Sequence, residues 1–392
     1  MKTYIEKLQQ VAVMTGITLA GIGSSGAMTP ANALTFNFTA GTGVIVGSQV
    51  YQGFTDAGAI WSSLFTNDVT LNFTINYQDR DIGASTLGYA NTTNPVYNYN
   101  IVANALASHR NPLSADDTAA VNSLSSGSNF NILINQTIDR PSGSASATPY
   151  VDNDGGANNR RVAMTNANAK VLGLIPDGTE DANIVFNSAF NWDFDFSDGI
   201  TPGTFDFVGV AAHEIGHALG FISGVDGLDD ANGAIAENGT FLRTLDLFRY
   251  SALSNDITLN TSRTIDFTAD ERDKYFSLDG GLTKIASFAR GVNFGRDTCT
   301  PGGTLLCPRQ ASHWSDNLDI GIMDPTTAAG EILTVSENDL RAFDVIGWNR
   351  ATVATAVPEP ADFIGTAIGA VFGFKLIQKR RQQRAKSTTK TI

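Results

Sequence analysis

The stretch FDFVGVAAHEIGHALG, residues 205–220, decides how the rest of the chain is interpreted. Its apolar residues recur at helical spacing, and Gly220 can adopt the left-handed backbone that ends many helices. We therefore predict a helix over 205–220. Residues four apart on a helix lie on one face, about 6 Å apart along the axis. The imidazoles of His213 and His217 are therefore expected to reach one common point.

The residue types of this pattern are those of a zinc site. Neutral imidazole is a good zinc ligand, and an open tetrahedral site takes three such ligands and a water. Zinc lowers the pKa of that water from about 16 to about 7, and a carboxylate beside the first ligand can take its proton. Two of the four histidines of the chain lie here, which favours a metal site over two ordinary histidines. We predict His213 and His217 as ligands and Glu214 as general base.

The third ligand lies outside this stretch. In the compact form of such a site a histidine follows three residues after the glycine, and here that position is Ser223. His313 is the one histidine farther downstream, and Met323 follows it in the sequence IMDP, which is typical of a turn. Ordinary packing of Met323 in the core is the alternative. His109 has no visible partner in the sequence and is predicted at the surface.

Carboxylates that follow the helix remain alternatives for the third ligand. Asp226 and Asp229 come just after Gly220, and Glu237 is also possible, because a downstream glutamate serves some zinc peptidases.

This arrangement resembles the leishmanolysin-like metzincins, in which a long insertion separates the glycine from the third histidine and a methionine turn follows. The resemblance covers residues 207–221 and 312–348. It implies that His313 completes the zinc site, that Met323 lies beneath the metal, and that Gly220 turns the chain into a second subdomain. It also implies hydrolysis of peptide bonds as the activity.

Two features depart from that family. Its proregion carries a cysteine that blocks the zinc, whereas no cysteine precedes the motif here. The family is also rich in disulfides, and this chain contains only Cys299 and Cys307. Because the N-terminus has the pattern of an exported protein, we predict that these two form one disulfide that closes a small loop.

Periodicity and turn residues outside the motif predict an α+β fold. Strands are expected over 34–38, 69–77 and 183–196, helices over 48–65, 99–108, 115–124, 160–173 and from Ser336 onward, and a loop over 224–240. Interleaved elements before residue 220 and irregular structure after it suggest two subdomains with a cleft between them. The resemblance implies a metzincin-like arrangement, with a twisted sheet and the active-site helix above an irregular C-terminal subdomain. The predicted boundaries are 34–222 and 223–350.

The two ends of the chain are predicted to be targeting segments. Residues 1–33 combine Lys2 and Lys7 with an apolar run and the cleavage pattern Ala-Asn-Ala, as in a signal peptide. Residues 351–392 contain a linker, the triplet Pro-Glu-Pro, an apolar stretch and a basic cluster. This tail resembles the PEP-CTERM sorting signal, with a plain tail anchor as the alternative. The resemblance implies a Gram-negative-type bacterium, exosortase-type sorting machinery, transient membrane contact through the tail, and delivery to the cell surface or outside.

The overall composition excludes some partners. The net charge is −13 and both ends are basic, so residues 34–350 are more acidic still. Nucleic acid is therefore not expected as a partner. Two acidic groups suggest structural calcium, with solvated loops as the alternative. They are Asp193, Asp195 and Asp198 before the helix, and Asp226, Asp229 and Asp230 after it.

Two functional classes remain. One is a secreted or surface-delivered zinc endopeptidase, with a protein or peptide substrate held along an edge strand, for which residues 183–196 are the candidate. The other is a non-catalytic cell-surface or matrix protein that retains the same fold. Glu214 favours the enzyme, because binding alone gives no chemical reason for a carboxylate at that position.

Overall fold

The computed structural model describes residues 34–79, 86–112, 114–231, 233–256, 263–291, 309–316 and 318–351. All of them belong to one compact unit. The predicted signal peptide, the sorting tail from residue 352 on, and both cysteines lie outside the described residues. None of the helices in the described part combines the length and the apolar character that crossing a membrane requires.

Helices and strands alternate along the chain, in agreement with the predicted α+β class. The helices are α2 Gln49–Leu64, α3 Tyr99–His109, α4 Ala115–Ser123, α5 Asn166–Val171, α6 Phe207–Leu219, α7 Val225–Ala231 and α8 Glu337–Asp344, with short 3-10 helices η1 Phe196–Asp198, η2 Glu237–Gly239, η3 Leu245–Phe248 and η4 Leu253–Asn255. The strands are β1 Thr35–Ala40, β2 Thr70–Gln78, β3 Gly88–Thr92, β4 Val96–Asn98, β5 Ile132–Ile134, β6 Tyr150–Asp152, β7 Arg161–Ala163, β8 Ala182–Asn187, β9 Trp192–Asp193, β10 Phe205–Asp206, β11 Leu242–Arg243, β12 Arg249–Tyr250, β13 Ile265–Asp266, β14 Lys274–Phe276 and β15 Ala286–Phe288.

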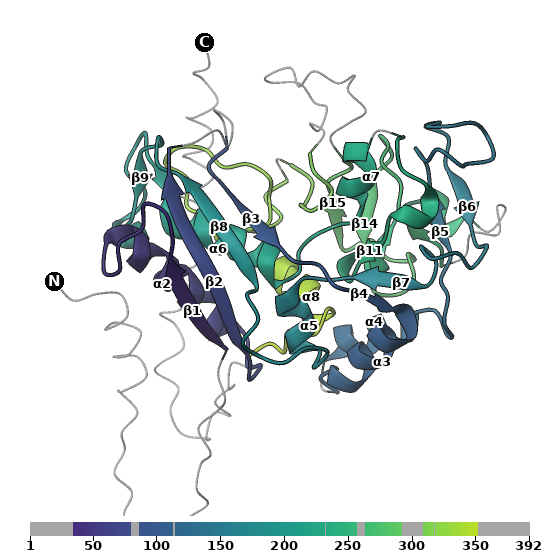
Figure 1. The fold of residues 1–392 in the computed structure, drawn as a ribbon, viewed down its shortest axis with the longest axis horizontal. Helices are drawn as coiled ribbons and strands as arrows, with labels where there is room; N and C mark the ends of the chain where they lie inside the picture. Colours follow the sequence, from purple (N-terminus) through teal and green to yellow (C-terminus); the bar gives the residue numbers. More distant parts are fainter. Residues whose placement is uncertain are drawn as a thin grey trace, which may run out of the picture. The chain divides into compact units, whose positions relative to one another are not determined.

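The largest sheet has the strand order β1-β2-β8-β3 (Figure 1). Strands β1, β2 and β8 run parallel, and β3 runs antiparallel to β8 at one edge. Helices α2 and α6 pack against each other, with α2 beside β1 and α6 beside β3 and β8. Parallel strands need such crossover segments between them, and the crossovers cover the sheet.

Aromatic side chains join the sheet to the two helices. The ring centroid of Phe54 on α2 lies 4.9 Å from that of Phe186 on β8 and 5.3 Å from that of Phe207 on α6. Farther along α2, the indole N–H of Trp61 donates to the carbonyl of Ala212 at 2.9 Å. All of these side chains are buried. The first half of α6, from Phe207 to Ala212, is therefore held against a buried aromatic core.

The remaining strands of the described part form four small sheets, which short helices accompany. Their strand orders are β11-β7-β4, β13-β5-β6, β12-β14-β15 and β10-β9. Strands β5 and β6 lie at the opposite end of the described unit from β1 and β2 (Figure 1). After residue 220, where the sequence predicted irregular structure, the described strands are only two or three residues long.

Three predicted elements are wrong in part. The helix expected over 160–173 is instead β7 followed by α5, because Val162 pairs with two strands and the Thr165 hydroxyl caps a new helix by accepting from Asn168 N–H. The loop expected over 224–240 contains α7 and η2. The strand expected over 183–196 ends at Asn187, whose side chain accepts from Ala189 N–H and turns the chain.

The structure also differs from the prediction in which strand forms the edge of the sheet. Strand β8 pairs with β2 on one side and with β3 on the other, so it is interior rather than at an edge. Within the described part of the chain, β3 pairs with β8 alone and forms the edge of the sheet beside α6. Residues 183–196 are therefore not the edge strand that the sequence pattern suggested.

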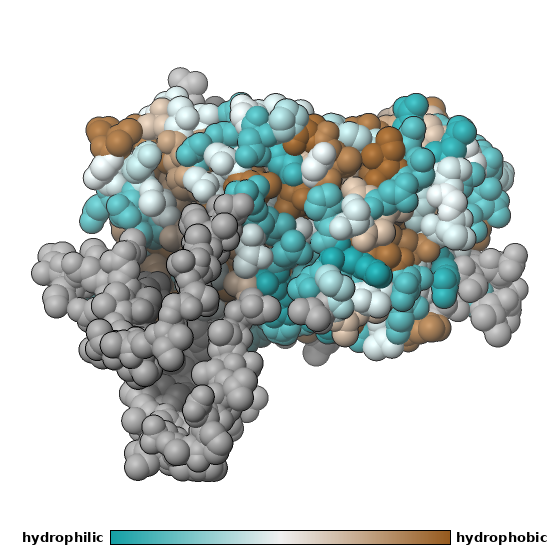
Figure 2. Space-filling model, turned by 90° about the horizontal axis from the view of Figure 1, so that it is seen from below, coloured by the Kyte–Doolittle hydropathy of each residue, from teal (hydrophilic) through white to brown (hydrophobic). Residues whose placement is uncertain are grey.

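The surface is mixed in character. On the face shown in Figure 2, hydrophobic residues form small groups between hydrophilic ones. Large apolar side chains that are strongly exposed include the neighbours Ile45 and Val46 and, far from them in the sequence, Leu282. Isolated residues of this kind are ordinary on a protein surface.

Candidate metal centre

Helix α6 is fixed at both ends, which sets the direction of its side chains. The Asp206 carboxylate caps the N-terminus and accepts from Gly209 N–H at 2.8 Å. Gly220 ends the helix at φ 121°, a backbone conformation that side chains with a Cβ rarely adopt, as the sequence predicted. Between these ends, His213 and His217 follow each other by one turn on a helix that is otherwise almost entirely buried.

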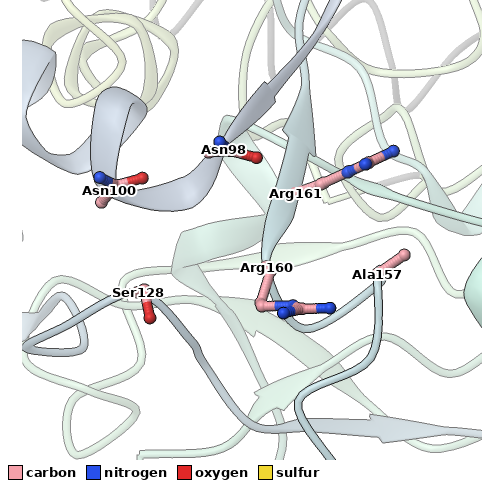
Figure 3. Close-up of a pocket in the computed structure, with 6 residues that line it drawn as sticks. All are labelled: Asn98, Asn100, Ser128, Ala157, Arg160 and Arg161. Carbon is pink, nitrogen blue, oxygen red and sulfur yellow. The ribbon is translucent and has the colours of Figure 1, made fainter.

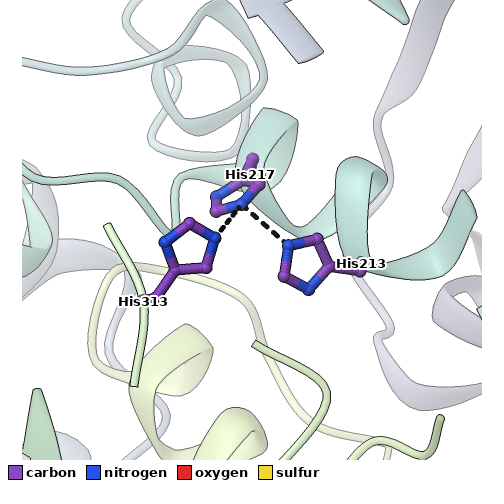
Figure 4. Close-up of side chains that lie close together, drawn as sticks. All are labelled: His213, His217 and His313. Carbon is purple, nitrogen blue, oxygen red and sulfur yellow. Dashed lines mark hydrogen bonds between the residues drawn. The ribbon is translucent and has the colours of Figure 1, made fainter. Parts of the chain in front are cut away.

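His213, His217 and His313 converge, and we call them the histidine centre (Figure 4). The Nε2 atom of His217 lies 3.0 Å from that of His213 and 3.1 Å from that of His313. His313 is 96 residues away from His217 in the sequence. The structure therefore brings together the three histidines that the sequence singled out.

The other nitrogen of each ring faces a backbone carbonyl. The Nδ1 of His213 lies 2.7 Å from Ile322 O, that of His217 lies 2.8 Å from Phe221 O, and that of His313 lies 3.3 Å from Gln310 O. A carbonyl only accepts, so each neutral ring carries its proton on Nδ1. The three Nε2 atoms then face one another as lone pairs and cannot hydrogen-bond to each other. A cation satisfies all three at once.

Burial keeps these rings in the form that binds metal. It lowers the pKa of His213 and lowers that of His217 to about 3, with the neighbouring imidazole of His213 adding to the effect. The pKa of His313 is also well below the usual value, first through burial and then through His217 and His213. Metal ligands must be deprotonated, and the three rings are neutral at neutral pH.

Glu214 directly follows His213 on α6 and is buried. The residue is 7% exposed, and the N–H of Ala90 on the edge strand β3 donates to its carboxylate. Burial raises the pKa of Glu214 to about 8. The Glu214 carboxyl therefore holds its proton more readily than an exposed glutamate, and it contacts the edge strand β3.

The predicted methionine turn packs directly under the helix. Met323 is fully buried, and a Cβ added to Gly216 would lie 2.5 Å from its Sδ atom. A larger residue at 216 would therefore force this sulfur to move from its position against the helix. The preceding carbonyl, of Ile322, is the one that accepts from His213. The turn supports the histidine centre from below and orients one ring.

Asp339 holds the segments of the third histidine and the turn together, a role that sequence reasoning missed. Its carboxylate accepts from the indole N–H of Trp314 at 2.8 Å and from Ile322 N–H at 2.9 Å. It also completes a capping box with Ser336 at the start of α8. The capping pattern is visible in the sequence, but the two distant donors are not.

Asp226, an alternative ligand, has a different position. Its carboxylate accepts from the N–H of Ala311 at 2.6 Å and from the backbone and hydroxyl of Ser312. It therefore ties the residues before His313 to the start of α7. Asp229 is fully buried and is not part of the histidine centre.

Glu237 and His109 also lie elsewhere. Glu237 accepts from the hydroxyl of Tyr150 at 2.6 Å and groups with other carboxylates. His109 is half-buried at the end of α3, and its Nδ1 lies 3.0 Å from Ala105 O one turn earlier, a contact within the helix that the sequence pattern did not reveal.

The two acidic groups suggested for calcium do not assemble within the described residues. Asp193 accepts from the N–H groups of Asp195 and Thr201, and Asp195 accepts from Ser197 N–H, so these side chains order their own loop. Asp198 and the group that follows α6 do not converge on a common point either. A different set of carboxylates does so, namely Asp152, Asp154 and Glu237.

A separate hollow of about 330 Å³ is drawn in Figure 3. It is lined by Asn98, Asn100, Ser128, Ala157, Arg160 and Arg161. These residues include no acid, base or nucleophile set of the kind that carries catalysis. The histidine centre is the stronger candidate for chemistry.

Fold and site together define an α+β protein with a convergent three-histidine group and an adjacent buried glutamate. Comparisons of the chain with protein-family models, with curated proteins and with solved structures find no match. The function is therefore argued from the site alone.

Proposed function

We propose that the protein is a zinc-dependent endopeptidase of the leishmanolysin-like metzincin type. The observation that carries this proposal is the convergence of three histidine Nε2 atoms, two of them from the helix that also carries the buried Glu214. The methionine beneath Gly216 and the glycine turn at the end of α6 agree with the same type.

The donor set suits zinc. Three neutral imidazoles, each oriented by a carbonyl at its other nitrogen, are the ligands of an open catalytic zinc site. Zinc held there by His213, His217 and His313 would supply a Lewis acid that polarises the scissile carbonyl and makes a water acidic. Glu214 takes the proton of the attacking water and delivers it to the leaving amine.

The substrate is proposed to lie along β3. This strand is the sheet edge beside α6, and its Ala90 N–H already contacts the Glu214 carboxylate. An extended peptide can add to such an edge through main-chain hydrogen bonds. The scissile bond of a peptide bound in this way would lie close to Glu214. Because main-chain groups hold the peptide, no particular side chain of the substrate would be needed.

We also propose that the protein acts outside the cytoplasm. The support is the signal-peptide pattern of residues 1–33 and the PEP-CTERM-like tail of residues 351–392. On this proposal, exosortase-type machinery processes the tail after a transient contact of that segment with the membrane.

Hydrolysis of an unfolded protein substrate by the purified, zinc-loaded protein tests the proposal. We expect Glu214→Gln to lower kcat by about 10²–10⁴-fold while zinc stays bound, because the variant keeps the shape and loses the base. His109→Ala is the matched control, since this histidine lies on α3 away from the centre. It should leave activity and zinc content unchanged.

Zinc-loaded protein that cleaves no substrate would contradict the enzyme proposal. That result, together with full zinc occupancy, would instead favour the non-catalytic surface or matrix protein. If Glu214→Gln stayed active, only the assignment of Glu214 as the base would be contradicted, and the zinc enzyme proposal would stand.

A further inference from the structure

A second group of ligand-type side chains lies away from the histidine centre. Asp152 at the end of β6, Asp154 in the following loop and Glu237 in η2 each offer a carboxylate oxygen, and these oxygens lie within 4.8 Å of one another. Burial, with the charges of Glu237 and Asp154, raises the pKa of Asp152 to about 6. Three carboxylates at this spacing repel one another unless a cation or protons compensate them.

A buried amide is directed into the same group. Asn158 is fully buried, and its Nδ2 donates to Asp152. Its Oδ1 is buried without a hydrogen-bond partner. Buried polar atoms nearly always have a partner, so this oxygen calls for one.

Side-chain oxygens gather beside Gly156. A Cβ added to this glycine would be 2.3 Å from Oδ1 of Asn238, 2.8 Å from Oδ1 of Asp154 and 3.0 Å from Oδ1 of Asn158. The unpartnered amide oxygen and a carboxylate of the group therefore border one small region. Only a glycine at 156 keeps this region free of a side chain.

We propose that Asp152, Asp154, Asn158 and Glu237 form a calcium site, which we call the oxygen site. All four offer hard oxygen ligands, with no nitrogen or sulfur that would favour zinc. Asp154 is exposed and Glu237 is half-buried, so water molecules can complete the six to eight oxygen ligands that calcium takes. The mixture of a buried and an exposed carboxylate suits the flexible geometry of calcium better than the strict octahedron of magnesium.

The ion would join segments that come from separate sheets. The oxygen site follows β6, which belongs to the sheet β13-β5-β6, and it precedes β7, which belongs to the sheet β11-β7-β4. Glu237 comes from η2, shortly before β11. Calcium therefore ties together the part of the unit that lies far from β1 and β2 (Figure 1) and stabilises it without taking part in hydrolysis.

Calcium binding to the purified full chain, zinc-loaded beforehand, tests the proposal. We expect one calcium per chain, a rise in thermal midpoint with calcium, and Tb³⁺ luminescence excited through Tyr150, whose hydroxyl contacts Glu237. Asp154→Asn and Glu237→Gln should each weaken calcium binding by about tenfold or more. Asp154 is exposed, so its variant is expected to fold.

Asp198→Asn is the matched control, because it removes an exposed carboxylate from an acidic loop that does not converge. It should leave calcium affinity unchanged, and all three variants should keep their zinc. The proposal is overturned if the protein binds no calcium, if Asp154→Asn binds it as tightly as the parent, or if magnesium stabilises the protein equally well. None of these outcomes bears on the zinc proposal, which rests on different residues.

Discussion

The histidine centre and the oxygen site both bring ligand-type side chains together, but they differ in ligand atoms and in rigidity. The first uses three imidazole nitrogens on a buried helix and a distant segment, each ring oriented by a backbone carbonyl. The second uses carboxylate and amide oxygens on a loop and a 3-10 helix, with one member exposed. The rigid nitrogen set suits zinc and reaction chemistry, and the looser oxygen set suits calcium and stability.

Rigidity in the histidine centre has an identifiable origin. Met323 fills the space at Gly216, and Asp339 holds the turn that carries Met323 against Trp314. Asp154 is exposed in a glycine-containing loop, where its carboxylate accepts from Gly156 N–H at 2.6 Å within the same loop. The two sites are therefore expected to respond very differently to loss of a single side chain.

The largest effect is expected from removing the third histidine. His313→Ala leaves two ligands, so we expect zinc affinity to fall by about a thousandfold or more and activity to be lost with it. Metal analysis after dialysis measures the first and substrate hydrolysis the second. If His313→Ala kept one zinc per chain, His313 would not be a zinc ligand, and the proposed contrast between the two sites would fail.

The next effect concerns the support of the histidine centre. Asp339→Ala leaves buried donors on Trp314 and Ile322 without their acceptor, so unfolding in urea should require about 3–5 kcal/mol less. Glu337→Gln, two residues earlier on the exposed side of α8, is the control; it weakens only an exposed ion pair with Arg350 and should change stability by less than about 1 kcal/mol. A small loss for Asp339→Ala would show that the turn is held by packing alone.

A smaller effect separates the two ions. Calcium at about a hundredfold above its Kd should add about 2.7 kcal/mol to the free energy of unfolding. The same increment is expected in His313→Ala, because the oxygen site shares no residue with the histidine centre. Differential scanning calorimetry with and without calcium measures it. An increment that disappears with His313 would mean that the two sites are coupled.

The smallest effect comes from a buried carboxylate outside both sites. Burial, followed by the charges of Asp344 and Asp116, raises the pKa of Asp117 to about 7 from 3.8. Between these values the folded protein keeps a proton that the unfolded chain has lost, so this group's contribution to stability is lost as the pH rises. We expect Asp117→Asn to gain up to about 2 kcal/mol relative to the parent between pH 4 and pH 8.

Urea unfolding of both proteins across that pH range provides the measurement. Parallel pH profiles would argue against a protonated Asp117. Zinc and calcium contents should be unchanged, because burial of a carboxylate does not by itself make a metal site.

Much of the centre was predictable because its information is local. A helix repeats every 3.6 residues, so the spacing of His213 and His217 already places both rings on one side. The cap at Gly220 and the capping box at Ser336 are also short-range patterns, and the structure contains both. The α+β class followed from the same periodicities.

Other features were decided only when distant segments packed together. Whether β8 or β3 forms the sheet edge depends on strand order, which no single strand encodes. The role of Asp339 and the unpartnered Oδ1 of Asn158 likewise appear only with their neighbours in place. Spacing along a chain constrains contacts within one turn of helix or one strand, whereas long-range contacts depend on how whole surfaces fit. For this protein, the sequence by itself determined that His213 and His217 share one face of a helix, with Glu214 between them in the chain. Tertiary structure placed His313 beside the two histidines and brought Asp152, Asp154 and Glu237 together.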